Sequence, residues 1–171
     1  MALLKLRIVP DPLLRQKAKR VRNVDAYLQR LINDMVETMH HENGVGLAAN
    51  QVGVLQRVVV IQLQEDEQAR VLINPEVLQR EGNLELEEGC LSIPGYRGLI
   101  PRSETVRVKA LDRQGKPFRI KADGLLAEVL EHEIDHLNGI LYINHIDSHE
   151  KLYKIELASE EPEEAMEASV G

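Results

Sequence analysis

The sequence has one cysteine, no tryptophan and only 3% aromatic residues. A single cysteine excludes an internal disulfide framework, and it indicates a reducing compartment or a thiol that is reactive or binds a metal. With so few aromatic residues, the core must be built from leucine, isoleucine and valine. No apolar run approaches the length of a membrane-spanning helix, so we expect no membrane partner.

A secretory signal is not expected, because Lys5 and Arg7 interrupt the first apolar stretch and no small-residue cleavage site follows. The 171 residues are 43% hydrophobic and 29% charged, which is the composition of an ordinary globular protein. This length is enough for one domain with a substantial core. We therefore expect a cytoplasmic, single-domain protein.

The net charge of −7 is concentrated near the C-terminal end. Residues 156–171 contain six glutamates and no lysine or arginine, so residues 1–155 account for only one of the seven negative charges. We predict one folded domain over 1–155 and a flexible acidic tail over 156–171. No basic block indicates nucleic-acid binding, and the cations between Arg15 and Arg22 are expected to form solvated surface.

Hydrophobic periodicity predicts an amphipathic helix over 25–42, which ends at Asn43-Gly44, and a second helix over 124–138. Asn74-Pro75 is expected to stop one strand, and a short helix is expected from Ser148 to about Glu156. The predicted strands are 57–63, 69–73, two short strands within 76–88, a hairpin of 105–111 with 117–122, and 141–143. The fold class is therefore α+β, with antiparallel or mixed sheets packed around a central helix.

The strongest chemical signal lies in the second predicted helix. At about 100° per residue, His132 and His136 lie roughly 40° apart on one face and about 6 Å apart along the axis. Both imidazoles can therefore reach one metal ion, while Glu133 is poorly placed as a third ligand and is free to handle protons. This is the H-E-x-x-H arrangement of metal-dependent hydrolysis. Histidines on a helix can also be simple surface or core groups.

Cys90 follows a glycine and two acids and precedes a Pro-Gly turn, which predicts a position in or near a loop. A thiolate with two imidazoles would form a three-ligand site that leaves one position open for water, as catalytic zinc sites do. The alternative is a buried, inert thiol.

Residues 44–53 combine three glycines and two alanines between the first helix and the first strand. Such small residues allow a ligand or another strand to lie against the main chain, and Gln51 offers an amide donor and acceptor there. A tight turn packed beneath the helix would explain the composition equally well. The glycines do not form a phosphate-binding loop.

Three segments, 44–51, 88–92 and 132–136, occur in this order and together resemble the three motifs of the peptide deformylases. They read Gly-Val-Gly-Leu-Ala-Ala-Asn-Gln, Glu-Gly-Cys-Leu-Ser and His-Glu-Ile-Asp-His. Each motif alone is moderately specific, whereas the ordered trio is highly specific. The resemblance extends from Pro10 to Asp147, and the absence of long insertions is similar to the type-1 branch of bacteria and organelles.

The resemblance implies that Cys90, His132 and His136 bind a catalytic metal and that Glu133 is the acid/base. It also implies that the Gln51 side-chain amide and the Leu91 backbone N–H stabilise the oxyanion. The residues implied to contact the substrate peptide or its first side chain are Gly46, Gly89, Leu125 and Val129.

The implied activity is metal-dependent removal of the N-formyl group from the N-terminal formylmethionine of newly synthesised polypeptides, with release of formate. The implied native ion is Fe2+, with Zn2+, Ni2+ or Co2+ possible in purified samples, although a Cys-His-His set also suits zinc. The implied partners are the nascent polypeptide N-terminus and, transiently, the ribosome.

Two positions depart from the family's pattern. Glu128 stands where an apolar or basic residue is more usual, beside the implied pocket for the first side chain. Asn50 stands where threonine or proline is frequent and should matter little.

An H-E-x-x-H zinc endopeptidase is the alternative enzyme. The metzincin pattern needs a third histidine where Tyr142 stands, and a thermolysin-like site would have to recruit Glu150 or Glu156. Neither the metzincin nor the thermolysin-like site would explain a function for the segment 88–92.

A non-catalytic metal-binding module is the other alternative, with His145 or Asp135 as a fourth ligand. Such a closed site would hold no exchangeable water. It would also leave Glu133 without a role.

Overall fold

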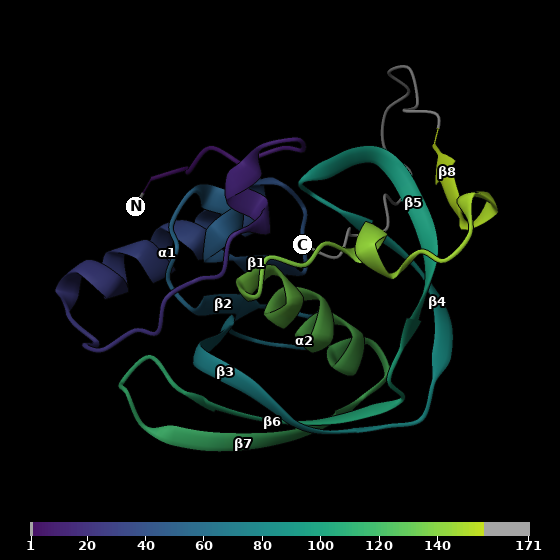
Figure 1. Cartoon of the computed structure of the whole chain (residues 1–171). Helices are drawn as coiled ribbons and strands as arrows, with labels where there is room; N and C mark the ends of the chain where they lie inside the picture. The colour runs from purple at the N-terminus through teal and green to yellow at the C-terminus, as the bar shows by residue number, and fades with distance from the viewer. Residues whose placement is uncertain (1, 156–171) are drawn as a thin grey trace.

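The computed structural model describes residues 2–155, which form two α-helices and two antiparallel sheets (Figure 1). The helices are α1 (Ala26–His41) and α2 (Gly124–Leu137). One sheet has the order β1-β2-β3-β6-β7: β1 (Gly46–Ala48), β2 (Val58–Ile61), β3 (Arg70–Glu81), β6 (Thr105–Leu111) and β7 (Pro117–Asp123). The other has the order β4-β5-β8: β4 (Leu84–Cys90), β5 (Ile93–Arg102) and β8 (Leu152–Lys154). The predicted α+β class is confirmed.

Four short 3-10 helices connect these elements: η1 (Pro12–Arg15), η2 (Ala49–Val52), η3 (Tyr142–His145) and η4 (His149–Lys151). None of the helices within residues 2–155 is long and apolar enough to span a membrane. The acidic tail predicted over 156–171 lies outside the described residues.

The helix predicted over 25–42 is confirmed as α1. Asp25 caps it, because its carboxylate accepts a hydrogen bond of 2.9 Å from the Leu28 backbone N–H. The chain leaves the helix through Asn43, whose φ of 56° lies in the left-handed region that asparagine tolerates.

Strand β2 shows how the two helices share one sheet. Val58 and Val60 belong to the core formed with the apolar face of α1, whereas Val59 and Ile61 belong to the core formed with α2. Alternate residues of a strand point to opposite faces, so this part of the sheet is covered on both sides. Figure 1 shows α2 at the centre of the molecule, with the long strands curving around it.

Residues Asn74-Pro75 do not end a strand, contrary to the prediction. Strand β3 continues to Glu81 through an irregularity between Ile73 and Glu76. Asn74 makes this possible, because it adopts a φ of 52° and its side chain bonds the backbone N–H and C=O of Val21 at 2.8 and 2.9 Å. A bulge absorbs the proline while the pairing with β6 resumes beyond it.

The predictions for the three-stranded sheet were less accurate. Strand β5 was not predicted, because glycines and prolines interrupt its pattern. The strand predicted over 141–143 is wrong, since this segment forms η3, and the helix predicted from Ser148 is wrong, since η4 there leads into β8. Strand β8 pairs with β5 beside Gly98, where a Cβ atom would lie 2.7 Å from the Ile146 side chain. That long-range packing leaves no periodic signal in the sequence.

Candidate active site

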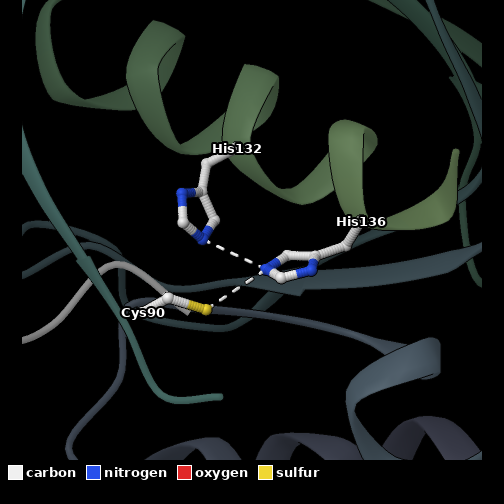
Figure 2. A group of neighbouring side chains, drawn as sticks. All are labelled: Cys90, His132 and His136. Atoms are coloured by element: carbon white, nitrogen blue, oxygen red, sulfur yellow. Dashed lines mark hydrogen bonds between the residues drawn. The ribbon is translucent and has the colours of Figure 1, made fainter. Parts of the chain in front are cut away.

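Three side chains from two distant segments meet beneath α2. His132 and His136 are one turn apart on the helix. Cys90 is the last residue of β4 and directly precedes the turn at Leu91-Ser92, which agrees with the prediction of a position in or near a loop. Their exposed fractions are only 2%, 1% and 5%, respectively. Figure 2 shows both imidazole rings and the thiol directed at one point between the helix and the strand end.

The spacing of these atoms matches the demands of one metal ion. The two Nε2 atoms lie 3.2 Å apart, and the Cys90 Sγ lies 3.5 Å from the His136 Nε2. A tetrahedral ion with usual bond lengths would separate two nitrogen ligands by roughly 3.3 Å, and a nitrogen and a sulfur ligand by roughly 3.6 Å. The residues therefore fit a metal ion, and within 2–155 they are the group of three residues whose ligand atoms lie within 4.8 Å of one another.

Glu133 lies beside this cluster and is fully buried. Its Oε1 is 4.0 Å from the His132 Nε2 and 3.8 Å from the His136 Nε2, and neither carboxylate oxygen has a hydrogen-bond partner among the described residues. Burial raises the pKa of the Glu133 carboxyl to about 7. A buried, unbonded carboxylate next to three side chains that could hold a metal ion is a candidate for proton transfer.

A second buried carboxylate, Glu88, holds His132 in place. Its Oε1 lies 2.7 Å from the His132 Nδ1, which leaves the Nε2 directed at the cluster. Burial alone would raise the pKa of Glu88, but hydrogen bonds from Arg102 and His132 outweigh this effect and lower the pKa to about 2. A carboxylate bonded to the far nitrogen of a metal-binding histidine fixes its tautomer and the orientation of its ring.

Arg102 completes this network from the end of β5. Its guanidinium donates to both oxygens of Glu88 at 2.7 and 2.9 Å and to Asp135 at 2.9 Å, and Asp135 also bonds His145 at 2.8 Å. Asp135 and His145 are therefore engaged with each other and do not supply a fourth ligand. No local sequence pattern indicates Arg102, because this residue ends a strand that the pattern does not predict.

Gln51, in η2, is fixed next to Cys90 by three contacts. Its Oε1 accepts from the Ala48 N–H at 3.0 Å, and its Nε2 lies 3.2 Å from the Ser92 Oγ and 3.7 Å from the Cys90 Sγ. The amide N–H group therefore faces the thiol. Leu91 follows Cys90 directly, so the structure brings both predicted oxyanion residues to the cluster.

The N-terminal segment ties these two parts together. The Arg7 N–H donates to the Gln51 carbonyl at 2.7 Å, and the Val9 N–H donates to the Ser92 carbonyl at 3.0 Å. Residues 7–9 thus bridge η2 and the turn after Cys90.

The four predicted substrate-contact residues lie at different depths. Gly46 packs directly on α2, where an added Cβ atom would lie 2.6 Å from the Glu133 Oε2 and 2.9 Å from the Val129 Cγ1. Val129 is fully buried, whereas Leu125 is 49% exposed. At Gly89 an added Cβ atom would meet only ordinary contacts, the nearest at 3.5 Å.

These features define a class of site. Within residues 2–155, three side chains that could hold a metal ion lie beside an unbonded carboxylate, which is the arrangement expected of a catalytic metal centre rather than of a closed structural one.

Comparison with known proteins identifies the family. The family model described as polypeptide deformylase matches residues 3–152. A peptide deformylase from Dehalococcoides mccartyi strain BAV1 is 51% identical over 167 residues, which cover 98% of this chain and 100% of the relative. The chain belongs to the polypeptide deformylase family.

Solved structures agree. A peptide deformylase from Legionella pneumophila superposes with a TM-score of 0.84 at 49% identity, covering 87% of this chain and 88% of the other. A peptide deformylase from Synechococcus elongatus, solved in complex with actinonin, gives a TM-score of 0.83 at 42% identity and covers 86% and 81%. The chain is accordingly a metal-dependent hydrolase that acts on formyl-methionyl peptides.

We expect Arg102→Leu to destabilise the fold by about 3–5 kcal/mol, because Glu88 and Asp135 would remain buried without their cation. The matched control is Arg70→Leu, which removes the more exposed ion pair with Asp66 and should cost about 1 kcal/mol or less. Denaturant unfolding measures both variants. Equal losses would contradict the importance of the buried network.

We expect Gly46→Ala to displace Glu133, because the new methyl group would overlap its carboxylate and the Val129 side chain. Turnover of a formyl-methionyl peptide should fall at least tenfold while metal content stays unchanged, since misplaced acid/base groups typically cost 10²-fold or more. Thermal unfolding of the Gly46→Ala protein checks that the fold is kept. A Gly46→Ala enzyme with normal turnover would show that the close approach has no catalytic consequence.

Proposed function

We propose that Cys90, His132 and His136 hold the catalytic metal ion with which this chain removes the N-formyl group from the N-terminal formylmethionine of new polypeptides. The observation that carries the proposal is the convergence of Sγ and two Nε2 atoms beside the unbonded Glu133 carboxylate. A divalent ion bound there supplies Lewis acidity, which lowers the pKa of water to near 7.

Glu133 is the proposed proton carrier. Its carboxyl, with a pKa raised to about 7, can exist in both protonation states near neutral pH. It accepts the proton from the attacking water and later delivers it to the departing amine of methionine. Glu88 and Asp135 are held by Arg102 and are not available for this role.

The Gln51 amide and the Leu91 N–H are the proposed donors to the oxyanion that forms when water adds to the formyl carbon. The Gln51 side chain is buried and its Oε1 is already bonded, so its N–H group is oriented before the substrate arrives. Such preorganised donors each contribute roughly 3–4 kcal/mol to lowering the barrier.

The proposed substrate groove is bounded by the backbone at Gly46 and Gly89, with Leu125 and Val129 beside the methionine side chain. The low bulk of both glycines supports this, since Gly89 has room that packing does not require. The exposed Leu125 would cover an apolar side chain without losing a core contact.

We further infer that the native ion is Fe2+, replaceable by Zn2+, Ni2+ or Co2+ in purified samples. A soft thiolate with two imidazoles accepts each of these ions, so availability decides among them. We place the reaction in the cytoplasm, where a single reduced cysteine is stable, and we infer transient association with the ribosome, where formylated chain ends arise.

The first test is anaerobic hydrolysis of formyl-Met-Ala-Ser by freshly prepared protein, with metal content measured on the same sample. We expect turnover with about one metal ion per chain, and loss of both in Cys90→Ala because two imidazoles alone bind weakly. Casein serves as the control substrate for an endopeptidase. Cleavage of casein, or a metal-loaded protein without turnover on the formyl peptide, would contradict the proposal.

We expect Glu133→Ala to retain its fold and its metal ion but to lose 10²- to 10⁴-fold in kcat, because only the proton carrier is removed. The control is Glu150→Ala, an exposed residue in η4. Metal analysis and thermal unfolding separate this effect from damage to the site. Near-normal turnover in Glu133→Ala would contradict the proposed mechanism.

A further inference from the structure

The outer face of the β6–β7 hairpin carries four cations in two directly opposed pairs. In the register of these strands Arg107 faces Lys121, and Lys109 faces Arg119. All four residues are exposed. Their immediate neighbours, such as Val108, point the other way into the core beneath α2.

This arrangement lowers the stability of the folded protein, because like charges directly opposite each other on a sheet repel. Among residues 2–155, only Lys109 has an acidic partner, Glu76 at 3.4 Å, and that pair is half exposed. Arg107, Arg119 and Lys121 make no side-chain hydrogen bond or ion pair with any described residue. Solvation of the surface alone does not explain why cations lie directly opposite one another, whereas binding of a polyanion does.

A fifth cation joins the hairpin at one end. Arg20, together with Lys109 and Arg119, lines a hollow of about 380 Å³. The rest of its lining is Asn74, the paired Glu76 and the apolar residues Ala110, Leu111, Pro117 and Phe118. Three cations thus converge on a concavity that is open to solvent and wide enough to take an anionic group.

Acidic residues limit the face at its other end. Thr105 lies opposite both Glu81 and Asp123, so the row beyond Arg107 and Lys121 is negative. We define the hairpin cation face as Arg20, Arg107, Lys109, Arg119 and Lys121.

We propose that the hairpin cation face binds the phosphate backbone of a folded nucleic acid. Three of its five cations are arginines, whose planar forks bond phosphate oxygens in pairs. No large apolar side chain of β6 or β7 is fully exposed, and Leu111 and Phe118 are only partly accessible at the hollow. The apolar anchor that a protein partner or a membrane surface would require is therefore small compared with the five cations. Backbone contacts of this kind are independent of base sequence.

The position of the face is compatible with catalysis. Strands β6 and β7 present their inner residues to α2, so the cations lie on the opposite side of the sheet from the helix that carries His132 and His136 (Figure 1). A nucleic acid bound there leaves the metal-binding cluster accessible. The inference does not depend on the proposed deformylation chemistry.

The test is fluorescence anisotropy of the full chain with a labelled RNA hairpin and with a DNA duplex of equal length, at about 50 mM salt and above. The hairpin variant carries Arg107→Gln, Lys109→Gln, Arg119→Gln and Lys121→Gln. The control variant removes the same charge from exposed residues elsewhere, through Lys5→Gln, Lys17→Gln, Arg30→Gln and Lys154→Gln.

We expect the wild-type and control proteins to bind the RNA, and the hairpin variant to bind at least tenfold more weakly. The magnitude of the slope of log K against log salt should fall by about 3.6, which is about 0.9 for each of the four cations removed. Formyl-peptide turnover should not change, and the melting temperature should stay equal or rise, because repulsive pairs are removed. Equal affinity for DNA would mean that the face recognises any nucleic-acid phosphate backbone. Weaker binding to DNA would mean that it prefers RNA.

Three results would overturn the proposal. The first is no binding of either nucleic acid at about 50 mM salt. The second is an equal loss of affinity in the control variant, which would show that only net charge matters. The third is binding of polyglutamate as tight as that of RNA and equally sensitive to the hairpin variant, which would assign the face to an acidic protein.

Discussion

The buried pair between Glu88 and Arg102 is the interaction on which the rest of the site depends. Glu88 receives both the guanidinium of Arg102 and the Nδ1 side of His132, and so joins β4, β5 and α2 at one point. Burying a carboxylate is costly unless its charge and its lone pairs are satisfied. Here the same contacts that satisfy Glu88 also orient the His132 imidazole, so fold stability and the geometry of the proposed metal site rest on one set of hydrogen bonds.

The two carboxylates near the cluster show how environment separates roles. Glu88 and Glu133 are both fully buried, yet the first has a pKa lowered to about 2 and the second a pKa raised to about 7. The difference lies in their partners, since Glu88 is surrounded by donors and Glu133 has none among residues 2–155. Opposite shifts of this kind divide structural support from proton transfer within a few ångströms.

Much of this could be predicted from the sequence. The periodicity of α1 and α2, the hairpin of β6 and β7, and the spacing of His132 and His136 are local properties, and all are confirmed. The failures are long-range. Strand β5 contains glycines and prolines that only the packing of distant segments explains, such as Gly98 against Ile146. Strand β3 continues beyond Pro75 only because Asn74 is hydrogen-bonded to Val21. Arg102 could not be singled out, because a lone arginine is informative only once its buried partners are known.

The cations of β6 and β7 form no block in the sequence, and only strand register brings them together.

The bridge made by residues 7–9 has a consequence for how the chain is made. These residues leave the ribosome before their partners Gln51 and Ser92, so they cannot take their places until those partners have been synthesised. The helix that carries His136 follows later still. Residues 7–9 are therefore fixed only after segments that are synthesised later, and the side chains of the site cannot come together until α2 has emerged.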